Sequence, residues 1–440
     1  MEIPPNIDTL IIGSGVGGAT IARELVRQGE TVVILEKGKD HQWPVGTVFA
    51  YATMYDIKKS KEGIIVRRGI TKGGSTLLYS GNAYDPPGFI KDELGIDLSG
   101  EVQETKEELR VRPVPKSFYE NYQGTIRLVD AASALGYSMK PQERFIDPDV
   151  CDPRCDRCLF GCKKDAKWTA RHYLDEIVGH GATLITEADV DRILIADSCA
   201  EGAVARTPQG TRRILANRVV LCAGGIGTPM ILQRTGMEAG SHFFTDPMSI
   251  LAGVVKEGAG TFHEITFTFA DDSHPGKFMI GNVGAVNGFF AQLFKLRLPF
   301  LLRLTQMKRI VGMFVKLCDE PSGRVDADGR IHKGLTKKDQ ERMDQGIEIA
   351  RSIMIRAGVI PETISVARGI GGHPGGTAAI GRVVDGDLQT KTKNLYVCDN
   401  SVMPRSGGVP PVLTLIALAK KAARQNFSLS SASDLNKSAN

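Results

Sequence analysis

The stretch DTLIIGSGVGG, residues 8–18, decides the fold class. Residues 8–12 form a short apolar run that is typical of a buried strand, and residues 19–29, ATIARELVRQG, have the apolar spacing of a helix. A second apolar run, TVVILEKG at residues 31–38, contains the acid Glu36 near its end. This order predicts a Rossmann-like α/β unit: a strand, a G-x-G-x-x-G turn, a helix and a second strand with an acid.

The glycines and the acid of this unit have physical roles in holding a dinucleotide. Gly13 allows the tight turn, Gly15 lets the backbone approach a pyrophosphate, and Gly18 lets the helix pack closely on the strand. The helix N-terminus directs its unbonded N–H groups toward the phosphates. The carboxylate of Glu36 accepts hydrogen bonds from ribose hydroxyls, and its charge repels a 2′-phosphate. The alternative is a glycine-rich turn without a ligand, and the motif alone does not distinguish NAD from FAD.

Length and composition limit the classes of protein that fit. The chain has 440 residues, of which 42% are hydrophobic and 24% charged, and it lacks an uncharged apolar run of about eighteen residues. These values predict a soluble protein of roughly two to three domains. The net charge of +5 is too small to indicate a nucleic-acid partner. The first residues do not resemble a signal peptide, which favours a cytoplasmic location.

Three further segments are similar to those of a known family. They are RRGITKGGSTLLYSGNAYDPP at residues 67–87, RVVLCAGGIGTPMILQRTGM at residues 218–237, and GGHPGGTAAIG at residues 371–381, which is followed by an apolar segment at residues 394–425. With the first glycine motif, their order and approximate spacing resemble the glucose–methanol–choline (GMC) oxidoreductases. The resemblance extends to about Gln425 and implies an enzyme that contains FAD.

The resemblance also implies the domain organisation. We expect an α/β fold in which a Rossmann-like FAD-binding domain is assembled from discontinuous segments and an α+β substrate domain contains an antiparallel sheet. The predicted ranges are 1–90, 180–245 and 370–428 for the FAD-binding domain, 91–179 for a Cys-rich connection, 246–369 for the substrate domain, and 429–440 for a disordered tail. Within the substrate domain, the residue pattern predicts strands at 263–270 and 277–286, a hairpin at 322–332 and a helix at 337–358.

Several cofactor contacts follow from the resemblance alone. It implies that Gly73, Gly74 and Ser75 lie along the flavin, and that Val190 lies in a strand whose backbone meets the adenine. The turn at Ala223 and Gly224 is similar to the turn that passes close to the dinucleotide. Asp399 matches the family's aspartate at the pyrophosphate and ribityl end of the flavin. The alternative for these glycines is simple turn formation.

His373 is the predicted catalytic residue. It lies in GGHPGGT, residues 371–377, which is too rich in glycine and proline to form a helix. An ordinary histidine pKa near neutrality suits proton abstraction from a hydroxyl group. The resemblance implies that this histidine faces the flavin and takes the alcohol proton while a hydride passes to the flavin. The alternative is a loop histidine that is hydrogen-bonded to the backbone.

One departure from the family pattern affects the predicted reaction. The second histidine or asparagine, expected about nine residues after Ser401, is replaced by Pro410, and Tyr79 stands where many members have asparagine. Either His373 acts alone, or a group from elsewhere assists it, or the substrate is not a simple alcohol. The rival functions are a flavin-dependent reductase of a C=C or C=O group, and a flavin electron-transfer subunit that has lost catalysis.

Four of the eight cysteines lie in CDPRCDRCLFGC, residues 151–162. The predicted metal ligands are Cys151, Cys155, Cys158 and Cys162. Four thiolates in one short loop favour an iron–sulfur cluster, and this segment is similar to one in long-chain alcohol oxidases and bacterial FAD sugar dehydrogenases. The alternatives are zinc, a metal-free structural loop and disulfides. A cluster would pass electrons singly to an acceptor protein or a quinone.

Residues 287–318 form an unusual basic and apolar segment. It has no acidic residue and six basic ones, and leucine, phenylalanine and arginine alternate along it. We consider three interpretations: a core-packed helix or helical hairpin interrupted at Pro299, a lid over a lipophilic substrate pocket, and an amphipathic helix on an anionic membrane surface. The substrate class predicted from the whole sequence is a lipophilic alcohol.

Overall fold

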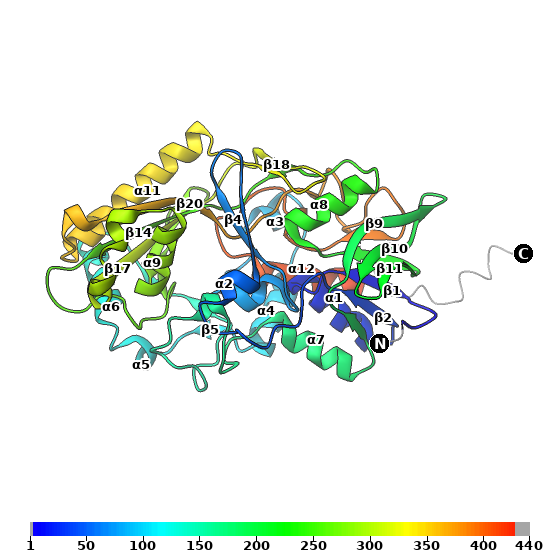
Figure 1. Cartoon of the computed structure of the whole chain (residues 1–440), viewed down its shortest axis with the longest axis horizontal. Helices are drawn as coiled ribbons and strands as arrows, with labels where there is room; N and C mark the ends of the chain where they lie inside the picture. Colours follow the sequence, from blue (N-terminus) through cyan, green and yellow to red (C-terminus); the bar gives the residue numbers. More distant parts are fainter. Residues whose placement is uncertain (1–2, 427–440) are drawn as a thin grey trace, which may run out of the picture.

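The computed structural model describes residues 3–426. A five-stranded parallel sheet lies at one end of the molecule (Figure 1), with the order β21-β12-β1-β2-β8. Its strands are β1 Thr9–Ile12, β2 Val32–Leu35, β8 Thr183–Ile185, β12 Arg218–Leu221 and β21 Leu395–Val397. All of them except the edge strand β8 are almost completely buried, as expected for a parallel sheet covered on both faces. The Rossmann-like unit is therefore confirmed, and its sheet is assembled from distant parts of the chain.

Four helices pack together beside this sheet. They are α1 Val16–Arg27, α4 Ser99–Glu108, α7 Ala170–Gly179 and α12 Val412–Gln425. Helix α1 contacts both α7 and α12, and α12 also contacts α4. A Cβ atom at Gly17 would lie 2.0 Å from the carbonyl oxygen of Cys398, so only glycine permits α1 to approach the end of β21 this closely.

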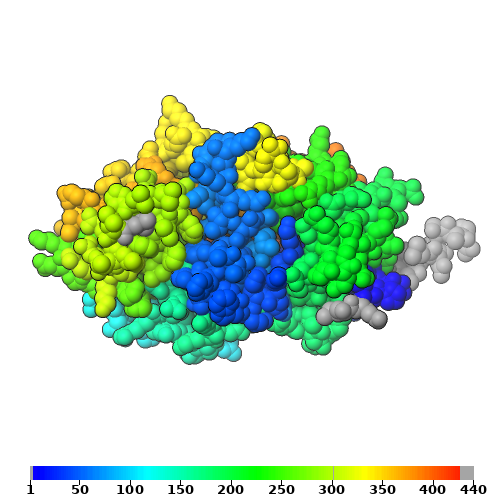
Figure 2. All heavy atoms as spheres, in the orientation of Figure 1, coloured from blue at the N-terminus to red at the C-terminus, as the bar shows by residue number. Residues whose placement is uncertain are grey.

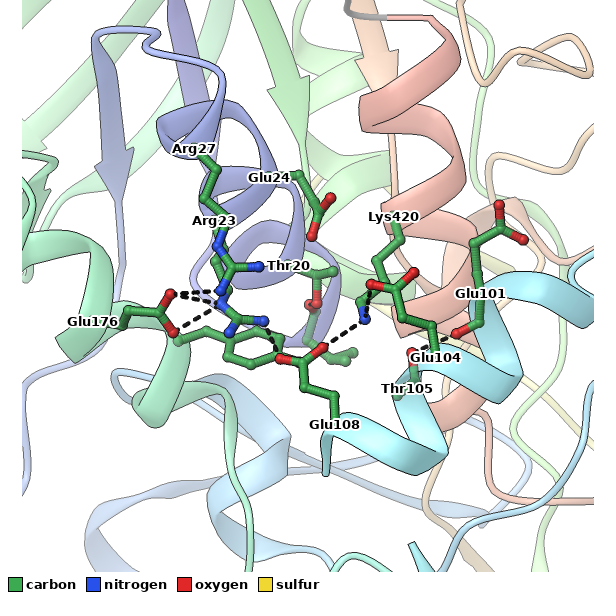
Figure 3. Close-up of polar contacts among 12 residues, drawn as sticks. Thr20, Arg23, Glu24, Arg27, Glu101, Glu104, Thr105, Glu108, Glu176 and Lys420 are labelled. Carbon is green, nitrogen blue, oxygen red and sulfur yellow. Dashed lines mark hydrogen bonds and ion pairs between the residues drawn. The ribbon is translucent and has the colours of Figure 1, made fainter. Parts of the chain in front are cut away.

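Ion pairs connect these four helices (Figure 3). Arg23 of α1 contacts Glu108 of α4, and its Nε lies 2.8 Å from Glu176 of α7. The Nζ atom of Lys420, whose side chain is completely buried in α12, lies 3.0 Å from Glu104 and 2.6 Å from Glu108. A buried ammonium group is stable only with such partners. The network therefore fixes how α4 and α7 lie against α1 and α12.

An eight-stranded sheet occupies the other end of the molecule (Figure 1). Its order is β3 Tyr55–Lys59, β4 Ile65–Gly69, β20 Ser365–Gly371, β14 Met248–Val254, β17 Ile310–Leu317, β16 Phe278–Val283, β15 Phe269–Asp271 and β6 Lys140–Pro141. Only the β4–β20 pair is parallel. Helix α11, Lys337–Arg356, packs on the face that includes Leu251 and Met313, and α9, Ala285–Phe294, packs on the face that includes Ile250. The expected antiparallel sheet with helices is present.

The remaining strands lie in smaller sheets. Antiparallel sheets are formed by β9 Asp189–Ala196, β10 Cys199–Thr207 and β11 Gly210–Leu215, by β13 Ser241–Phe243, β18 Gly323–Val325 and β19 Ile331–His332, and by β5 Arg112–Pro113 and β7 Glu143–Arg144. The other helices are α2 Ala50–Thr53, α3 Phe89–Asp92, α5 Lys116–Tyr119, α6 Gln123–Ala134, α8 Gly224–Arg234 and α10 Leu298–Leu301, with 3₁₀ turns η1 Gly74–Leu78, η2 Cys158–Phe160, η3 Leu304–Arg309, η4 Pro361–Thr363 and η5 Asn400–Val402.

Two of the predicted elements need correction. The strand predicted at 263–270 is mostly irregular, because His263 and Phe267 adopt positive φ angles of 61° and 57° that turn the chain, and only its end joins β15. The helical interpretation of residues 287–318 is wrong for residues 310–317, which form the buried strand β17. The hairpin at 322–332 and the helix at 337–358 are confirmed as β18–β19 and α11. The predicted tail, 429–440, lies outside the described residues.

Among residues 3–426, none of the helices has the length and apolar character needed to cross a membrane. The domain boundaries given above stay a prediction, since the sheets show which segments assemble but not where a domain begins.

Candidate functional site

One long cleft brings most of the predicted site residues together. It runs from the ends of β1 and β2, past η1 and the start of α8, to one face of the eight-stranded sheet. The predicted residues that line it are Gly13, Gly15, Glu36, Gly74, Ser75, Val190, Ala223, Gly224, His373 and Asp399. Two others support its wall from behind. Gly18 packs against Gly13, and the N–H of Gly73 donates a hydrogen bond to Ser14 Oγ at 3.0 Å.

Glycine leaves open space at two positions in the cleft. A Cβ atom built on Gly15 or on Gly224 would meet no described protein atom within 4 Å, and both residues line the cleft. These residues stand at the starts of α1 and α8, where N–H groups have no partner within the helix. The start of α1, with free space in front of it, fits the pyrophosphate of a dinucleotide, whereas the Gly224 N–H at the start of α8 is bonded to Asp399.

Glu36 is held by the backbone around the glycine turn. Its carboxylate accepts hydrogen bonds from Ser14 Oγ at 2.6 Å, Ser14 N at 3.0 Å and Gly38 N at 2.6 Å. Burial raises the pKa of Glu36, and these hydrogen bonds oppose that effect. A carboxylate has about four acceptor positions. Three are used by the protein, which leaves one for a ribose hydroxyl.

Asp399 joins two elements at the same cleft. Its Oδ2 atom accepts hydrogen bonds from Gly224 N at 2.8 Å and Thr228 Oγ1 at 2.5 Å, and its Oδ1 atom accepts one from Ser401 N at 2.7 Å. Burial raises the pKa of its carboxyl group, and the donors lower it. Asp399 therefore fixes the start of α8 against η5 and places a carboxylate on the cleft wall.

His373 has a partner that the sequence did not indicate. Its Nδ1 atom lies 3.1 and 3.0 Å from the two carboxylate oxygens of Asp246. A carboxylate only accepts hydrogen bonds, so Nδ1 bears the proton in the neutral imidazole. The Nε2 atom is then the proton acceptor of the ring, in a residue that lines the cleft.

Asp246 also forms a buried ion pair with Lys316 of β17. Their side chains are only 3% and 4% exposed, and Lys316 lines the same cleft as His373. Behind them, the backbone N–H of Asp246 donates to Asp319 at 2.8 Å, and Asp319 pairs with Lys333 at 2.8 Å. Burial raises the pKa of Asp319 to about 6, although Lys333 acts in the opposite direction. The histidine is thus supported by two buried ion pairs, Asp246–Lys316 and Asp319–Lys333, which a backbone hydrogen bond connects.

Sequence reasoning missed this pair because the two residues are far apart and belong to no motif. Met248 of β14 is the register partner of Lys316 in β17, and Asp246 stands two residues before Met248. Pairing of these strands alone brings the carboxylate to the ammonium group. Pro410 and Tyr79 line the same cleft, so the departure from the family pattern lies at the site itself.

The end of the cleft near His373 has an apolar wall. Its lining includes Tyr84, Met248, Phe267, Met279 and Phe314, which also pack in one hydrophobic cluster. Phe314 and Lys316 are alternate residues of β17, so their side chains leave the same face of the sheet. The site therefore combines an imidazole and an ammonium group with a wall of aromatic and methionine side chains.

The four cysteines of residues 151–162 are free thiols, so no disulfide joins them. Burial raises the pKa of Cys151 to about 12, and the neighbouring thiols Cys158, Cys162 and Cys155 act in the same direction. The four groups therefore lie near one another. Across residues 3–426, however, three or more His, Cys, Asp or Glu side chains are nowhere arranged to hold a metal ion. The structure gives the predicted metal ligands no support.

The cysteine loop packs against the wall of the cleft. Lys167, which is almost completely buried, donates hydrogen bonds to the carbonyl oxygens of Leu77 at 3.1 Å, Tyr79 at 2.5 Å and Cys158 at 2.8 Å. The hydroxyl of Tyr55 donates to Leu159 O at 2.7 Å, and Leu159 itself lines the cleft. The loop is thus tied to η1, which runs along the cleft.

Comparisons with known proteins agree with this geometry. Two GMC oxidoreductase family models match residues 94–257 and 315–419, and a model of an NAD(P)-binding Rossmann-like domain matches residues 11–41. The chain belongs to the GMC oxidoreductase family. It is therefore an oxidoreductase of a family that binds FAD through its Rossmann-like domain and acts on CH–OH groups.

Individual relatives cover nearly the whole chain. An uncharacterised protein of Methanocaldococcus jannaschii is 29% identical over 428 residues, which is 95% of this chain and 99% of the relative. A long-chain-alcohol oxidase of Arabidopsis thaliana is 23% identical over 94% of this chain and 66% of its own length. The crystal structure of pyridoxine 4-oxidase from Mesorbium loti has a TM-score of 0.72 at 16% identity, over 96% of this chain and 99% of that chain. The last similarity concerns the fold alone.

Proposed function

We propose that this GMC oxidoreductase oxidises a lipophilic alcohol and that Nε2 of His373 takes the hydroxyl proton. The observation that supports this most directly is the hydrogen bond between His373 Nδ1 and Asp246, because it leaves Nε2 as an acceptor in the cleft. FAD, when bound at the end of the cleft lined by Gly13, Gly15 and Gly224 (the glycine edge), supplies the hydride acceptor. The residues of this chain bind the alcohol, orient it and hold the proton.

Asp246 and Lys316 support the base in different ways. Asp246 holds the imidazole in one tautomer and stabilises its protonated form after proton transfer. Lys316 balances the charge of Asp246, since a buried carboxylate without a cation would be strongly unfavourable. In this arrangement, Lys316 supplies the polar group that Pro410 lacks on the cleft wall.

The apolar wall supports a lipophilic substrate. An alcohol with an alkyl or aromatic body would bury that body against Met248, Phe267, Met279 and Phe314. Four relatives are named long-chain-alcohol oxidase in Arabidopsis thaliana, which agrees with this substrate class. The acceptor that reoxidises the flavin is proposed to be a protein or a quinone.

Anaerobic reduction of the flavin by alcohols tests this proposal. We expect primary alcohols of increasing chain length to bleach the visible flavin absorbance of the purified holoenzyme. His373→Gln should slow bleaching by on the order of 10²–10⁴-fold, which is the usual contribution of a general base. His242→Gln is the matched control, because this histidine is not part of the cleft lining.

The outcome also separates the rival functions. Unchanged bleaching in His373→Gln would contradict the assigned base. If no alcohol bleaches the flavin but a reduced flavin is reoxidised by an unsaturated or carbonyl compound, the chain is a reductase. Asp246→Asn should reduce the rate and alter its pH profile while the flavin stays bound, as expected for a positioning residue.

We also propose, from the cysteine spacing, that residues 151–162 hold an iron–sulfur cluster in protein purified without air. The proximity of the four thiols supports this, although they are not placed as ligands and the alcohol oxidation above does not use them. Iron and sulfide analysis tests it, with Cys158→Ser expected to lose metal and Cys199→Ser to retain it. Zinc without iron would favour a zinc site, and no metal would favour a structural loop.

A further inference from the structure

Residues 293–304 present leucine side chains to solvent. Leu296, Leu298 and Leu302 are 74%, 64% and 84% exposed, and Leu293 and Leu304 are exposed as well. Leu293 lies in α9, Leu298 in α10 and Leu304 in η3, and the other two leucines lie in the residues that connect these elements. We call these five residues the leucine surface. Such a concentration of exposed leucine in one segment is typical of a surface that binds a protein or a membrane.

The same segment is positively charged. It includes Lys295, Arg297 and Arg303, with Lys308 and Arg309 shortly after it, and residues 287–318 contain no acidic residue. None of the five makes an ion pair with another described residue. Instead, Lys295 donates to Gly63 O at 2.9 Å and Arg309 Nη2 donates to Val255 O and Lys256 O at 2.6 Å each. The charges therefore have no counter-charge within the described chain.

A second apolar segment lies beside the leucine surface. Trp43 and Phe49 are 71% and 58% exposed, and their rings stack with centroids 5.9 Å apart. The next residues connect it to α9, because Tyr51 contacts Phe290 and Phe294 with centroid distances of 5.2 and 5.0 Å. Figure 2 shows the yellow-green part of the chain beside the blue N-terminal part on one face of the molecule.

We propose that the leucine surface, together with residues 43–49, docks this protein on an anionic lipid bilayer. The leucines and Trp43 would enter the boundary between headgroups and acyl chains, while the basic residues contact anionic headgroups. This inference concerns binding and does not depend on the proposed reaction.

The positive charge of this surface favours binding to an anionic bilayer over binding to a second copy of the chain. A symmetric dimer through this surface would place the same five cations opposite one another, and like charges in a contact are unfavourable.

The buried side of α9 connects the leucine surface to the cleft. Ala291 packs in the cluster of Met248 and Phe314, which line the cleft, so docking would bring the apolar end of the cleft near the lipid.

Vesicle co-sedimentation of the full-length holoenzyme tests the proposal. We expect binding to phosphatidylcholine vesicles that contain about one quarter phosphatidylglycerol, weaker binding to pure phosphatidylcholine, and loss of the difference at about 1 M salt. Leu296→Ser with Leu302→Ser should lower the partition coefficient on the order of ten-fold. Arg297→Ala with Lys308→Ala should lower it about five-fold per residue on anionic vesicles only.

Strand β11 supplies matched controls on another part of the surface. Leu215 is 59% exposed there, and Arg212 and Arg213 are exposed in the same strand. Leu215→Ser, and Arg212→Ala with Arg213→Ala, should leave vesicle binding unchanged. Flavin absorbance and thermal unfolding of each variant establish that it is folded.

Three results would overturn the proposal. The first is no binding to anionic vesicles by the wild-type protein. The second is equal loss of binding in the leucine-surface variants and in the β11 controls. The third is a dimer in sedimentation velocity that Leu296→Ser with Leu302→Ser dissociates, together with no vesicle binding, which would assign the surface to a second copy of the chain.

Discussion

Gly15 and Gly18 are three positions apart in one motif, yet they are needed for different reasons. A Cβ atom at Gly15 would extend into the open cleft, whereas a Cβ atom at Gly18 would lie 2.0 Å from the carbonyl oxygen of Gly13. The first glycine therefore leaves room for a ligand, and the second permits the contact between α1 and the end of β1.

The two glycines are expected to give opposite results when each is replaced by alanine. Gly15→Ala should fold normally and bind FAD at least about ten-fold more weakly, because the methyl group occupies space beside the pyrophosphate. Gly18→Ala should lower the free energy of unfolding by about 1–3 kcal/mol through the backbone contact. Thermal unfolding and FAD titration of the apoprotein measure both effects, and equal losses of stability in the two variants would contradict this division.

Glu264 is a buried acid in a loop that contacts the start of α6. Its carboxylate accepts hydrogen bonds from Gly124 N and Thr125 N at 2.8 Å each and from Thr125 Oγ1 at 2.7 Å. Burial raises its pKa to about 7, and these donors act in the opposite direction. A long loop is thereby attached to the first turn of a helix by one side chain.

This raised pKa predicts a pH dependence of stability. The folded state keeps a proton that the unfolded chain releases at its ordinary pKa of about 4.3. Stability should therefore fall as the pH rises from about 4.3 to about 7, and then stay level, as far as this group is concerned. Urea unfolding of the wild type and of Glu264→Gln at several pH values measures the difference. Glu348→Gln, at an exposed position of α11, is the control, and the same pH slope in both variants would contradict the assignment.

The ion network of α1, α4, α7 and α12 is expected to contribute more to stability than an ion pair at the surface. Glu108→Ala would remove a partner from both Arg23 and the buried Lys420, so we expect a loss of about 2–4 kcal/mol in the free energy of unfolding. Glu320→Ala, which breaks pairs with Lys338 and Arg342 at the surface, should cost less than about 1 kcal/mol. Chemical denaturation of both variants makes the comparison. Similar losses would show that burial of the network contributes little.

Across the whole molecule, the cleft is walled by both large sheets. The glycine edge belongs to the five-stranded sheet and its helices, and the apolar wall belongs to β14, β16 and β17 of the eight-stranded sheet. A cofactor that binds there contacts only the folded state, so it should stabilise the whole chain.

Removal of FAD is therefore expected to lower the thermal unfolding temperature. At a free concentration about a thousand-fold above Kd, a ligand contributes about 4 kcal/mol. Re-addition of FAD should restore the unfolding temperature of the apoprotein, and NAD should not. Restoration by NAD alone would contradict FAD as the dinucleotide.

The sequence by itself determined the local units of this protein. The strand, glycine turn, helix and acid at residues 8–36 are contiguous, and so are the hairpin of β18–β19 and helix α11. Their turns, periodicity and caps depend on neighbouring residues, so they are visible in the chain. Resemblance then indicated which distant segments accompany them, and the structure gathers most of those residues along one cleft.

Only the tertiary structure decided what surrounds His373. Its partner Asp246, and the pairing of Asp246 with Lys316, depend on the register of β14 against β17, which no local pattern specifies. The same reason explains why residues 310–317 form a strand and not a helix: their apolar run is buried on both faces of a sheet whose other strands come from distant segments. Contacts between distant segments set the chemistry of this site, whereas the residues along the chain set only its individual parts.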